Sequence, residues 1–287
     1  MPTQAGFGES PEEAPPVSVI TVVLNGGRYL EHAIQSVIAQ TYPHLEYIII
    51  DGGSTDGSVD IINRYSSYLA YWHTRPDKGV SHAYNLALAQ AKGTWILFLS
   101  ADDYFLDSQV VEKMGPYLTA HQDADVIFGE TIIMTQEAEP RPLPLAKIWG
   151  RPWQWREFCW SSLIPHPSAF TNRRYFDRWG GFDETFRLAI DYEIYLRAGR
   201  RLKTHFVPIP VSGMRRGGLT GQSLVRSLGE CRRAQIKNRT HPKGLCWLNF
   251  LWQIYRCYLG RVAHWALDPF ASQIAWRGRN SGRPQER

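Results

Sequence analysis

The sequence predicts an α/β fold in which a mostly parallel central sheet is flanked by helices. Short apolar runs rich in β-branched residues, such as VSVITVVL at 17–24 and LEYIII at 45–50, alternate with segments whose apolar residues recur at helical spacing. Because a strand, a helix and a second strand in this order form a parallel βαβ unit, the alternation predicts a parallel sheet wrapped by helices. A basic segment dense in Trp and Tyr near the carboxyl end predicts a helical appendage.

The elements of the first half follow from the points where the apolar runs stop. Asn-Gly-Gly at 25–27 and Tyr-Pro at 42–43 interrupt the runs and mark turns. Asp56 is placed to cap the helix that follows it. The expected order is a strand at 17–24, a helix ending by 42, a strand at 45–50, a helix through 59–62, a strand at 69–73, a helix at 81–92 and a strand at 95–99.

Composition indicates a globular protein with an uneven charge. The 287 residues are 44% hydrophobic, which is enough apolar material for a large core. Residues 1–200 contain 16 basic and 24 acidic side chains, whereas residues 201–287 contain 16 basic and 3 acidic ones. No recognised nucleic-acid-binding motif accompanies the basic charge, so a nucleic-acid partner is not expected.

The chain is expected to be cytoplasmic. Its four cysteines show neither CxxC nor metal-ligand spacing, which indicates reduced thiols. The first 16 residues are acidic and rich in Pro and Gly, unlike a signal peptide. The sequence contains no uninterrupted apolar run of 18 residues, so a membrane-spanning helix is not expected.

Polar side chains follow the predicted strands where these end. Asn25 follows the first strand, Asp51 the second, and Asp102 and Asp103 follow the strand at 95–99. In parallel sheets, ligands bind beyond the carboxyl ends of the strands, so these four residues should meet at one rim. Two adjacent carboxylates repel unless a cation lies between them, and Mg²⁺ or Mn²⁺ bridging two phosphates would fit.

Simpler interpretations of the same residues remain open. Asp-Gly-Gly-Ser at 51–54 is ordinary turn chemistry, and one carboxylate of the adjacent pair could cap a helix near Asp107 while the other is solvated. A GxGxxG fingerprint does not follow either of the first two strands, so a nicotinamide dehydrogenase is disfavoured.

Two long strings resemble a known family. VSVITVVLNGGRYLEHAIQSVIAQTYPHLEYIIIDGGSTDGS, followed by RPDKGVSHAYNLALAQAKGTWILFLSADD, is similar to the nucleotide-sugar-binding half of family-2 inverting glycosyltransferases with the GT-A fold. The similarity extends from about residue 17 to about residue 220. It implies a metal-dependent, hexosyltransferase-like enzyme that uses a nucleoside-diphosphate sugar, with a UDP-sugar favoured.

The resemblance assigns roles to residues at the rim. The aspartate in the place of Asp51 contacts the nucleotide base in that family. Asp102 matches the last acid of the DxD metal motif, with Asp103 as its neighbour in the metal site. The remaining nucleotide-site residues that the resemblance implies are Val23, Asn25, Lys78 and Asn85.

Two positions depart from the family pattern. The first position of DxD is Ser100, which weakens metal binding by two carboxylates of that motif. Position 82 is His where relatives often carry Asp, and this puts the donor preference in doubt.

The segment from 166 to 199 resembles the acceptor side of the same family. Asp191 follows a Gly-Phe-Asp turn and matches the general base. It would also lie in the first turn of a helix, where an acid is favoured by the helix dipole alone. His166 could orient a hydroxyl group or belong to an ordinary loop, and Glu193 could support the site or pair with Arg197 four residues later.

The resemblance implies direct displacement at the anomeric carbon. Asp191 takes the acceptor proton, and the diphosphate leaves from the opposite face with help from Lys78 and the metal. A nucleotidyltransferase and a non-catalytic sugar-nucleotide-binding or scaffold protein remain the alternatives. Arg215 and Arg216, followed by Gly-Gly-Leu-Thr, could form a mobile loop over the diphosphate.

The carboxyl-terminal segment predicts an amphipathic helix over 245–266. Its apolar face is formed by Leu245, Leu248, Trp252, Tyr255, Leu259, Val262 and Ala266. Flanking arginines favour an anionic membrane interface, where the enzyme would meet a lipid-linked or glycan acceptor at the inner face of the cell membrane. Packing on the catalytic domain or on a second copy is the alternative.

These observations predict four regions. Residues 1–16 form a disordered lead-in, and 17–220 form the GT-A domain, divided into a nucleotide-sugar-binding half at 17–104 and an acceptor half at 105–220. Residues 221–270 form the basic helical region, and 271–287 form a flexible tail.

Overall fold

A computed structural model describes residues 14–135, 148–216, 224–257 and 259. The chain divides into two compact units, Met1–Thr240 and His241–Arg287. The candidate site residues and all the labelled elements belong to the first unit.

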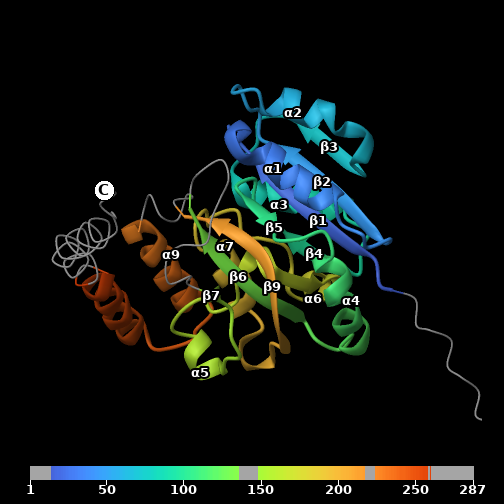
Figure 1. The fold of residues 1–287 in the computed structure, drawn as a ribbon. Coiled ribbons are helices and arrows are strands. Elements are labelled where there is room, and N and C mark those ends of the chain that lie inside the picture. Colours follow the sequence, from blue (N-terminus) through green and yellow to red (C-terminus); the bar gives the residue numbers. More distant parts are fainter. Residues whose placement is uncertain (1–13, 136–147, 217–223, 258, 260–287) are drawn as a thin grey trace, which may run out of the picture. The chain divides into compact units, whose positions relative to one another are not determined.

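The first half of that unit alternates strands and helices as the sequence predicts (Figure 1). Its elements are β1 (Val17–Val23), α1 (Gly27–Ile38), β2 (Leu45–Asp51), α2 (Ser58–Arg64), the 3₁₀ turn η1 (Ser66–Tyr68), β3 (Tyr71–Thr74), α3 (Val80–Gln90) and β4 (Trp95–Phe98). Asp56 accepts a hydrogen bond from the backbone N–H of Ser58 at 3.1 Å and from that of Gly27 at 2.9 Å. It therefore supports the first turns of two helices, α2 and α1.

The second half contains shorter elements and one long strand. They are β5 (Asp103–Phe105), α4 (Val110–Ala120), β6 (Val126–Met134), β7 (Ile148–Trp149), α5 (Trp155–Phe158), η2 (His166–Ser168), β8 (Ala169–Asn172), α6 (Arg173–Trp179), α7 (Ile190–Leu196), η3 (Gly199–Arg201), β9 (Thr204–Arg215) and α9 (Leu224–Lys237). In Figure 1, α9 lies beside α7.

The strands join in one mixed sheet of order β3-β2-β1-β4-β8-β6-β9-β5, with β7 paired to β6. The neighbours β3, β2, β1 and β4 are parallel, as are β6 and β9. Strands β8, β5 and β7 pair antiparallel with their neighbours. The predicted α/β class is confirmed, and its parallel part is the half that carries the rim residues.

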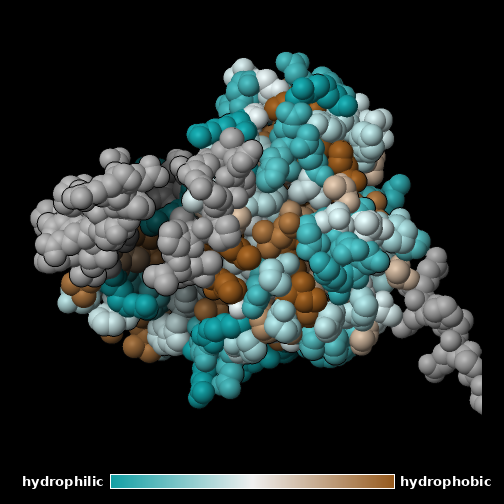
Figure 2. All heavy atoms as spheres, in the orientation of Figure 1, coloured by the Kyte–Doolittle hydropathy of each residue, from teal (hydrophilic) through white to brown (hydrophobic). Residues whose placement is uncertain are grey.

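Both faces of the central strands are buried, which explains their continuous apolar sequences. Alternate side chains point to opposite faces: Val19 and Leu97 pack in a core with α1 and α4, whereas Ile20 and Phe98 pack in a core with α3, α6 and α7. Figure 2 shows that apolar side chains also gather on the surface over the β6–β9 part of the sheet.

The second unit contains a helix over residues 243–257. Its large apolar side chains are solvent-exposed, with 43% of Leu245, 62% of Leu248, 56% of Trp252 and 52% of Tyr255 accessible. Leu259 is also exposed, and Val262 and Ala266 of the predicted face lie outside the described residues. Within the described part of the chain, no helix is long and apolar enough to cross a membrane.

Candidate active site

The carboxyl ends of β1 and β2 form the centre of the rim. In the parallel register Val23 lies opposite Asp51, and the backbone N–H of Gly52 donates to the carbonyl oxygen of Val23 at 2.9 Å. The side chain of Val23 is 5% exposed. Val23 thus places a buried apolar side chain next to Asp51 at the ends of the two strands.

Asp51 is fully buried and uses its two oxygens differently. Oδ2 accepts hydrogen bonds from the backbone N–H groups of Gly53 and Ser54, each at 3.0 Å, and from the Thr74 hydroxyl. Oδ1 receives no hydrogen bond from any described residue. A buried polar atom without a partner is costly, so Oδ1 is suited to a donor on a ligand. The turn interpretation and the ligand interpretation therefore apply to different oxygens of one carboxylate.

Asn25 connects two turns of the rim. Its Oδ1 accepts a hydrogen bond from the backbone N–H of Thr55 at 2.9 Å, and its own N–H donates to the Ser54 hydroxyl at 2.7 Å. Its φ of 53° lies in the left-handed region, which Asn tolerates better than most residues. Asn25 thus ties the turn after β1 to the turn after β2, next to Asp51.

Lys78 is exposed in the turn between β3 and α3. A Cβ atom on Gly52 would lie 2.8 Å from Oδ2 of Asp77, so the Asp77 carboxylate of this turn lies against the end of β2 and a side chain at position 52 would displace it. On its other side, a Cβ atom on Gly79 would lie 3.5 Å from the Arg187 guanidinium. The turn that follows β3 therefore has two cations, Lys78 within it and Arg187 against it.

The predicted carboxylate pair follows β4 and occupies two different environments. Asp102 is half-buried in a turn, whereas Asp103 is 4% exposed and begins β5. Burial raises the pKa of both, and the Asp102 charge raises that of Asp103 further. Oδ1 of Asp103 has no hydrogen-bond partner among the described residues. Two desolvated carboxylates that resist ionisation together form a site that a cation would stabilise.

The donor chemistry fits Mg²⁺ or Mn²⁺, which prefer carboxylate oxygens. The described residues contain no group of three or more His, Cys, Asp or Glu side chains arranged to hold a metal. An ion held by Asp102, with Asp103 beside it, would therefore depend on oxygen ligands from the substrate and solvent.

Arg215 contacts the turn that contains Asp102. The prediction that Arg215 belongs to a mobile loop is wrong. It is the last residue of β9 and is 3% exposed. Its guanidinium donates to the carbonyl oxygen of Asp102 at 2.8 Å, contacts Nδ1 of His32 at 2.9 Å and lies 5.0 Å from the Tyr104 ring centre. These contacts hold Arg215 in the protein interior. The Gly-Gly-Leu-Thr segment lies outside the described residues.

Asp191 lies in the first turn of α7, as expected. Burial raises its pKa to about 6, and backbone hydrogen bonds offset this only in part. Burial raises the pKa of Tyr84 most, and the charges of Asp103, Asp102 and Asp191 raise it further, so all three carboxylates lie near enough to Tyr84 to act on it. The fold thereby brings the candidate base and the candidate metal residues to one region.

His166 lies next to this region in an aromatic environment. Its ring stacks on Phe98 with 5.2 Å between ring centres and meets the Tyr84 ring at 5.9 Å. Desolvation lowers its pKa to about 4, so the imidazole is neutral at pH 7. Nε2 is buried and has no hydrogen-bond partner in the described part of the chain. A neutral imidazole with one available nitrogen suits the predicted contact with a hydroxyl group.

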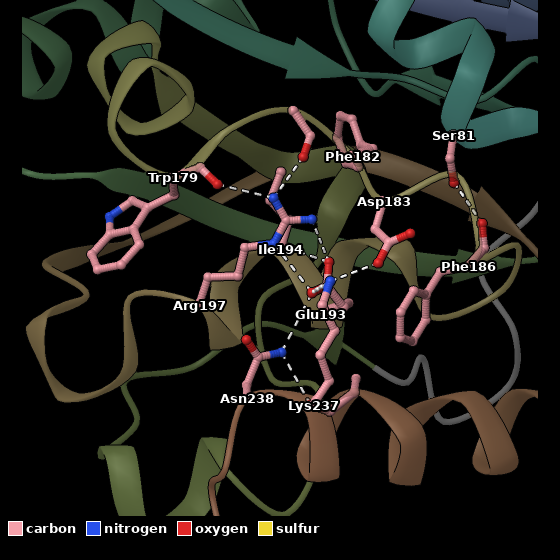
Figure 3. A network of polar contacts seen from close by, with 12 residues as sticks. Ser81, Trp179, Phe182, Asp183, Phe186, Glu193, Ile194, Arg197, Lys237 and Asn238 are labelled. Atoms are coloured by element: carbon pink, nitrogen blue, oxygen red, sulfur yellow. Dashed lines mark hydrogen bonds and ion pairs between the residues drawn. The ribbon is translucent and has the colours of Figure 1, made fainter.

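Glu193 forms the centre of an ion-pair network (Figure 3). Its side chain is 1% exposed and contacts Arg197 at 2.5 Å and Lys237 at 2.7 Å. Burial raises its pKa, but the hydrogen bonds from both cations outweigh burial and hold the pKa below its ordinary value. The predicted pairing with Arg197 is confirmed.

Asn85 connects α3 to the segment before α7. Its Nδ2 donates to the carbonyl oxygen of Phe182 at 2.9 Å, and its Oδ1 accepts from the N–H of the same residue at 2.7 Å. Because both amide atoms bond protein backbone, the geometry favours a positioning role over direct contact with a nucleotide.

Sequence reasoning missed the contacts that hold the segment before Asp191. Ser81 donates to the carbonyl oxygen of Phe186 at 2.6 Å, and Glu230 of α9 accepts from the backbone N–H groups of 187–189. The sequence contains one signal that could have pointed to Glu230: it is the single acidic residue in the sequence of α9, LVRSLGECRRAQIK.

Comparison with known proteins agrees with this geometry. The model of glycosyl transferase family 2 matches residues 18–215, which is most of the chain. The chain belongs to this family. It is 27% identical over 217 residues to a PGL/p-HBAD biosynthesis glycosyltransferase of Mycobacterium bovis, covering 74% of this chain and 81% of the relative. It is 32% identical over 190 residues to an uncharacterized glycosyltransferase of Mycobacterium tuberculosis, covering 64% and 69% respectively.

Solved glycosyltransferase structures share the fold. The structure of residues 1–349 of TarS from S. aureus in complex with UDP-GlcNAc matches with a TM-score of 0.60 and 18% identity, over 82% of this chain and 70% of that chain. A mannosyltransferase from Pyrobaculum calidifontis, in complex with GDP-Man and Mn²⁺, matches with the same TM-score and identity, over 98% and 81%. The chain spans 41% of a longer TarS structure. The glycosyltransferase has the predicted GT-A fold.

Proposed function

We propose that this glycosyltransferase is an inverting enzyme that moves a sugar from a nucleoside-diphosphate sugar, preferably a UDP-sugar, to a hydroxyl group of a glycan or lipid-linked acceptor. Such a reaction would serve polysaccharide or lipid-linked glycan synthesis. The observation that carries the proposal is the Asp191 carboxyl group, which burial brings to a pKa of about 6 near the carboxylates that follow β4. A base of this pKa is ionised at neutral pH and still accepts a proton readily.

The donor would bind across the ends of β1 and β2. Oδ1 of Asp51 is available to an N–H group of the base, with Val23 and Asn25 shaping the pocket around it. Lys78 is exposed in the turn whose Asp77 lies against Gly52 at the end of β2, and it would attract the diphosphate. Mg²⁺ or Mn²⁺ held by Asp102, with Asp103 as the second carboxylate, would neutralise charge on the diphosphate.

The acceptor would bind on the other side of the sugar. Asp191 would remove the proton of the acceptor hydroxyl group as its oxygen attacks the anomeric carbon, and the nucleoside diphosphate would leave from the opposite face. His166 would orient this hydroxyl group or a neighbouring one through Nε2. One displacement without a covalent enzyme intermediate inverts the anomeric configuration.

The first test is the thermal stability of the purified protein with UDP, GDP, CDP or ADP, each with Mn²⁺, Mg²⁺ or EDTA. A ligand at 100 times its Kd stabilises the folded state by roughly 2.7 kcal/mol. UDP with a metal should raise Tm, and Asp51→Asn should abolish this rise, whereas the control Asp60→Asn on exposed α2 should keep it. Absence of a shift with all four nucleotides would contradict the proposed donor site.

The second test is transfer itself. The protein is incubated with UDP-sugars and simple glycoside acceptors, and the product anomer is assigned by NMR. An inverted anomer is expected. A retained configuration would contradict the role of Asp191 as the base in a single displacement.

We also propose that the helix at 243–257 contacts the inner face of the cell membrane. Its exposed Leu, Trp and Tyr side chains and the 16 basic against 3 acidic residues of 201–287 complement an anionic lipid surface. Vesicles containing anionic lipid should bind the protein, neutral vesicles should bind it less, and Trp252→Glu should reduce binding. Self-association without vesicle binding, measured by sedimentation, would assign the face to a second copy instead.

A further inference from the structure

Three consecutive backbone N–H groups just before Asp191 converge on one side chain. Oε2 of Glu230 accepts from Arg187 at 3.0 Å, from Leu188 at 2.8 Å and from Ala189 at 3.0 Å, and Oε1 accepts from Arg187 at 3.2 Å. Hydrogen bonds to an ionised acceptor are stronger than neutral ones. The N–H groups of Leu188 and Ala189 are half-buried or buried, and without this carboxylate they would be left unsatisfied, which is costly. Glu230 therefore fixes the backbone that leads into α7.

The rest of α9 holds the same segment along its length. The Arg233 guanidinium lies 3.9 Å from the Phe186 ring centre, and Lys237 contacts Asp183 at 2.6 Å. The Cys231 thiol, next to Glu230, is half-buried; desolvation raises its pKa most, and the charges of Asp191 and Glu230 raise it further. This turn of α9 therefore lies close to Asp191 itself.

The opposite side of the segment faces the donor half. Ser81, at the start of α3, donates to the carbonyl oxygen of Phe186 at 2.6 Å (Figure 3), and the Arg187 guanidinium lies against Gly79 in the Lys78 turn. The segment is thus held between α3 and α9. Movement of 187–189 would change the position of Asp191 relative to the donor.

We propose that Glu230 is a positioning residue for Asp191: by binding the N–H groups of 187–189 it sets the location of the first turn of α7, and with it the surroundings of the Asp191 carboxyl group. This inference rests on the proposed role of Asp191 as the base. It makes α9 part of the catalytic apparatus, although Glu230 itself does not touch substrate.

The test uses Glu230→Ala, with Glu230→Asp as the conservative variant and Arg226→Ala as the control at an exposed site of the same helix. Hydrogen exchange at the amides of 187–189 should accelerate about tenfold or more in Glu230→Ala, because their acceptor is lost. The kcat should fall by about 10- to 100-fold, as expected for a misplaced catalytic group. The Kd for UDP should stay within about twofold.

The pH profile separates positioning from a purely structural role. If water reaches Asp191 in Glu230→Ala, its pKa should fall toward the ordinary value, so the acid limb of kcat/KM should move to lower pH. Near Asp191, burial raises the pKa values of Tyr84, Tyr195 and Cys231 above this range and lowers that of His166 to about 4. The raised pKa values of Asp102 and Asp103 are common to the wild type and Glu230→Ala, so the difference between the two acid limbs reports on Asp191. Glu230→Asp should give intermediate values, and Arg226→Ala should match the wild type.

Unchanged exchange at 187–189 together with an unchanged acid limb in Glu230→Ala would overturn the proposal. If Glu230→Ala does not fold, the same measurements on Glu230→Gln test whether Glu230 positions Asp191, because Gln keeps the size of the side chain and one acceptor oxygen. If the wild type transfers no sugar, the proposed function fails. The exchange rates and an NMR titration of the Asp191 carboxyl carbon then still decide whether Glu230 positions Asp191.

Discussion

Helix α7 presents two carboxylates two residues apart, in opposite environments. On the face toward α9, Glu193 contacts Arg197 and Lys237, and these cations hold its pKa below the ordinary value (Figure 3). On the face toward the rim, Asp191 is desolvated, and its pKa rises to about 6. The difference shows that cationic partners, and not burial alone, decide whether a buried carboxylate is a structural anion or a base.

The largest effect is expected from removing the base. Asp191→Asn keeps the shape of the side chain but cannot accept the acceptor proton, so the transfer rate should fall by about 10²- to 10⁴-fold. Binding of UDP, measured by the shift in Tm, should persist. Comparable turnover in Asp191→Asn and wild type would show that this face of α7 carries no base and would favour a non-catalytic binding protein.

The next largest effect, a loss of stability, is expected from replacing Glu193 of α7. Glu193→Ala leaves the Arg197 guanidinium, which is 14% exposed, without its carboxylate. Removing one partner of a buried ion pair costs about 3–5 kcal/mol. The Tm should therefore fall by roughly 10 °C, measured by differential scanning calorimetry.

The variant Glu193→Gln separates charge from hydrogen bonding at this position. Gln retains an acceptor for Arg197, and it should therefore lose less stability than Glu193→Ala. Equal Tm values for Glu193→Ala and wild type would show that the pair contributes nothing to the free energy of unfolding.

The sequence predicts one side of this comparison better than the other. Asp191 follows the Gly-Phe-Asp motif, and the i,i+4 spacing between Glu193 and Arg197 predicts that these two residues pair. Glu230 and Lys237 lie 37 and 44 residues after Glu193 in the sequence, and no local spacing relates them to α7. Their contacts depend on how α9 packs, which is a tertiary property. Likewise, the parallel strands β1 to β4 follow from βαβ alternation, whereas antiparallel β8 between β4 and β6 does not.

The pH dependence of transfer is a smaller effect that sharpens the comparison. Because Asp191 must be ionised to act as the base and its pKa is about 6, kcat/KM should fall about tenfold per pH unit below 6. His166 has a pKa of about 4 and should not contribute near pH 6. An acid limb near pH 4 in the wild type would mean that Asp191 is solvated like an ordinary surface carboxylate.

The smallest effect is expected where both charges of a pair are exposed. Asp123 and Lys203 lie 3.2 Å apart, but their side chains are 76% and 64% exposed, so water and salt screen their attraction. Asp123→Ala should change Tm by no more than about 1 °C and should leave transfer unaltered. Measured beside Glu193→Ala, it compares an exposed ion pair with a buried one. A loss of Tm as large as that of Glu193→Ala would mean that proximity of opposite charges, and not their removal from water, determines the stabilisation in this protein.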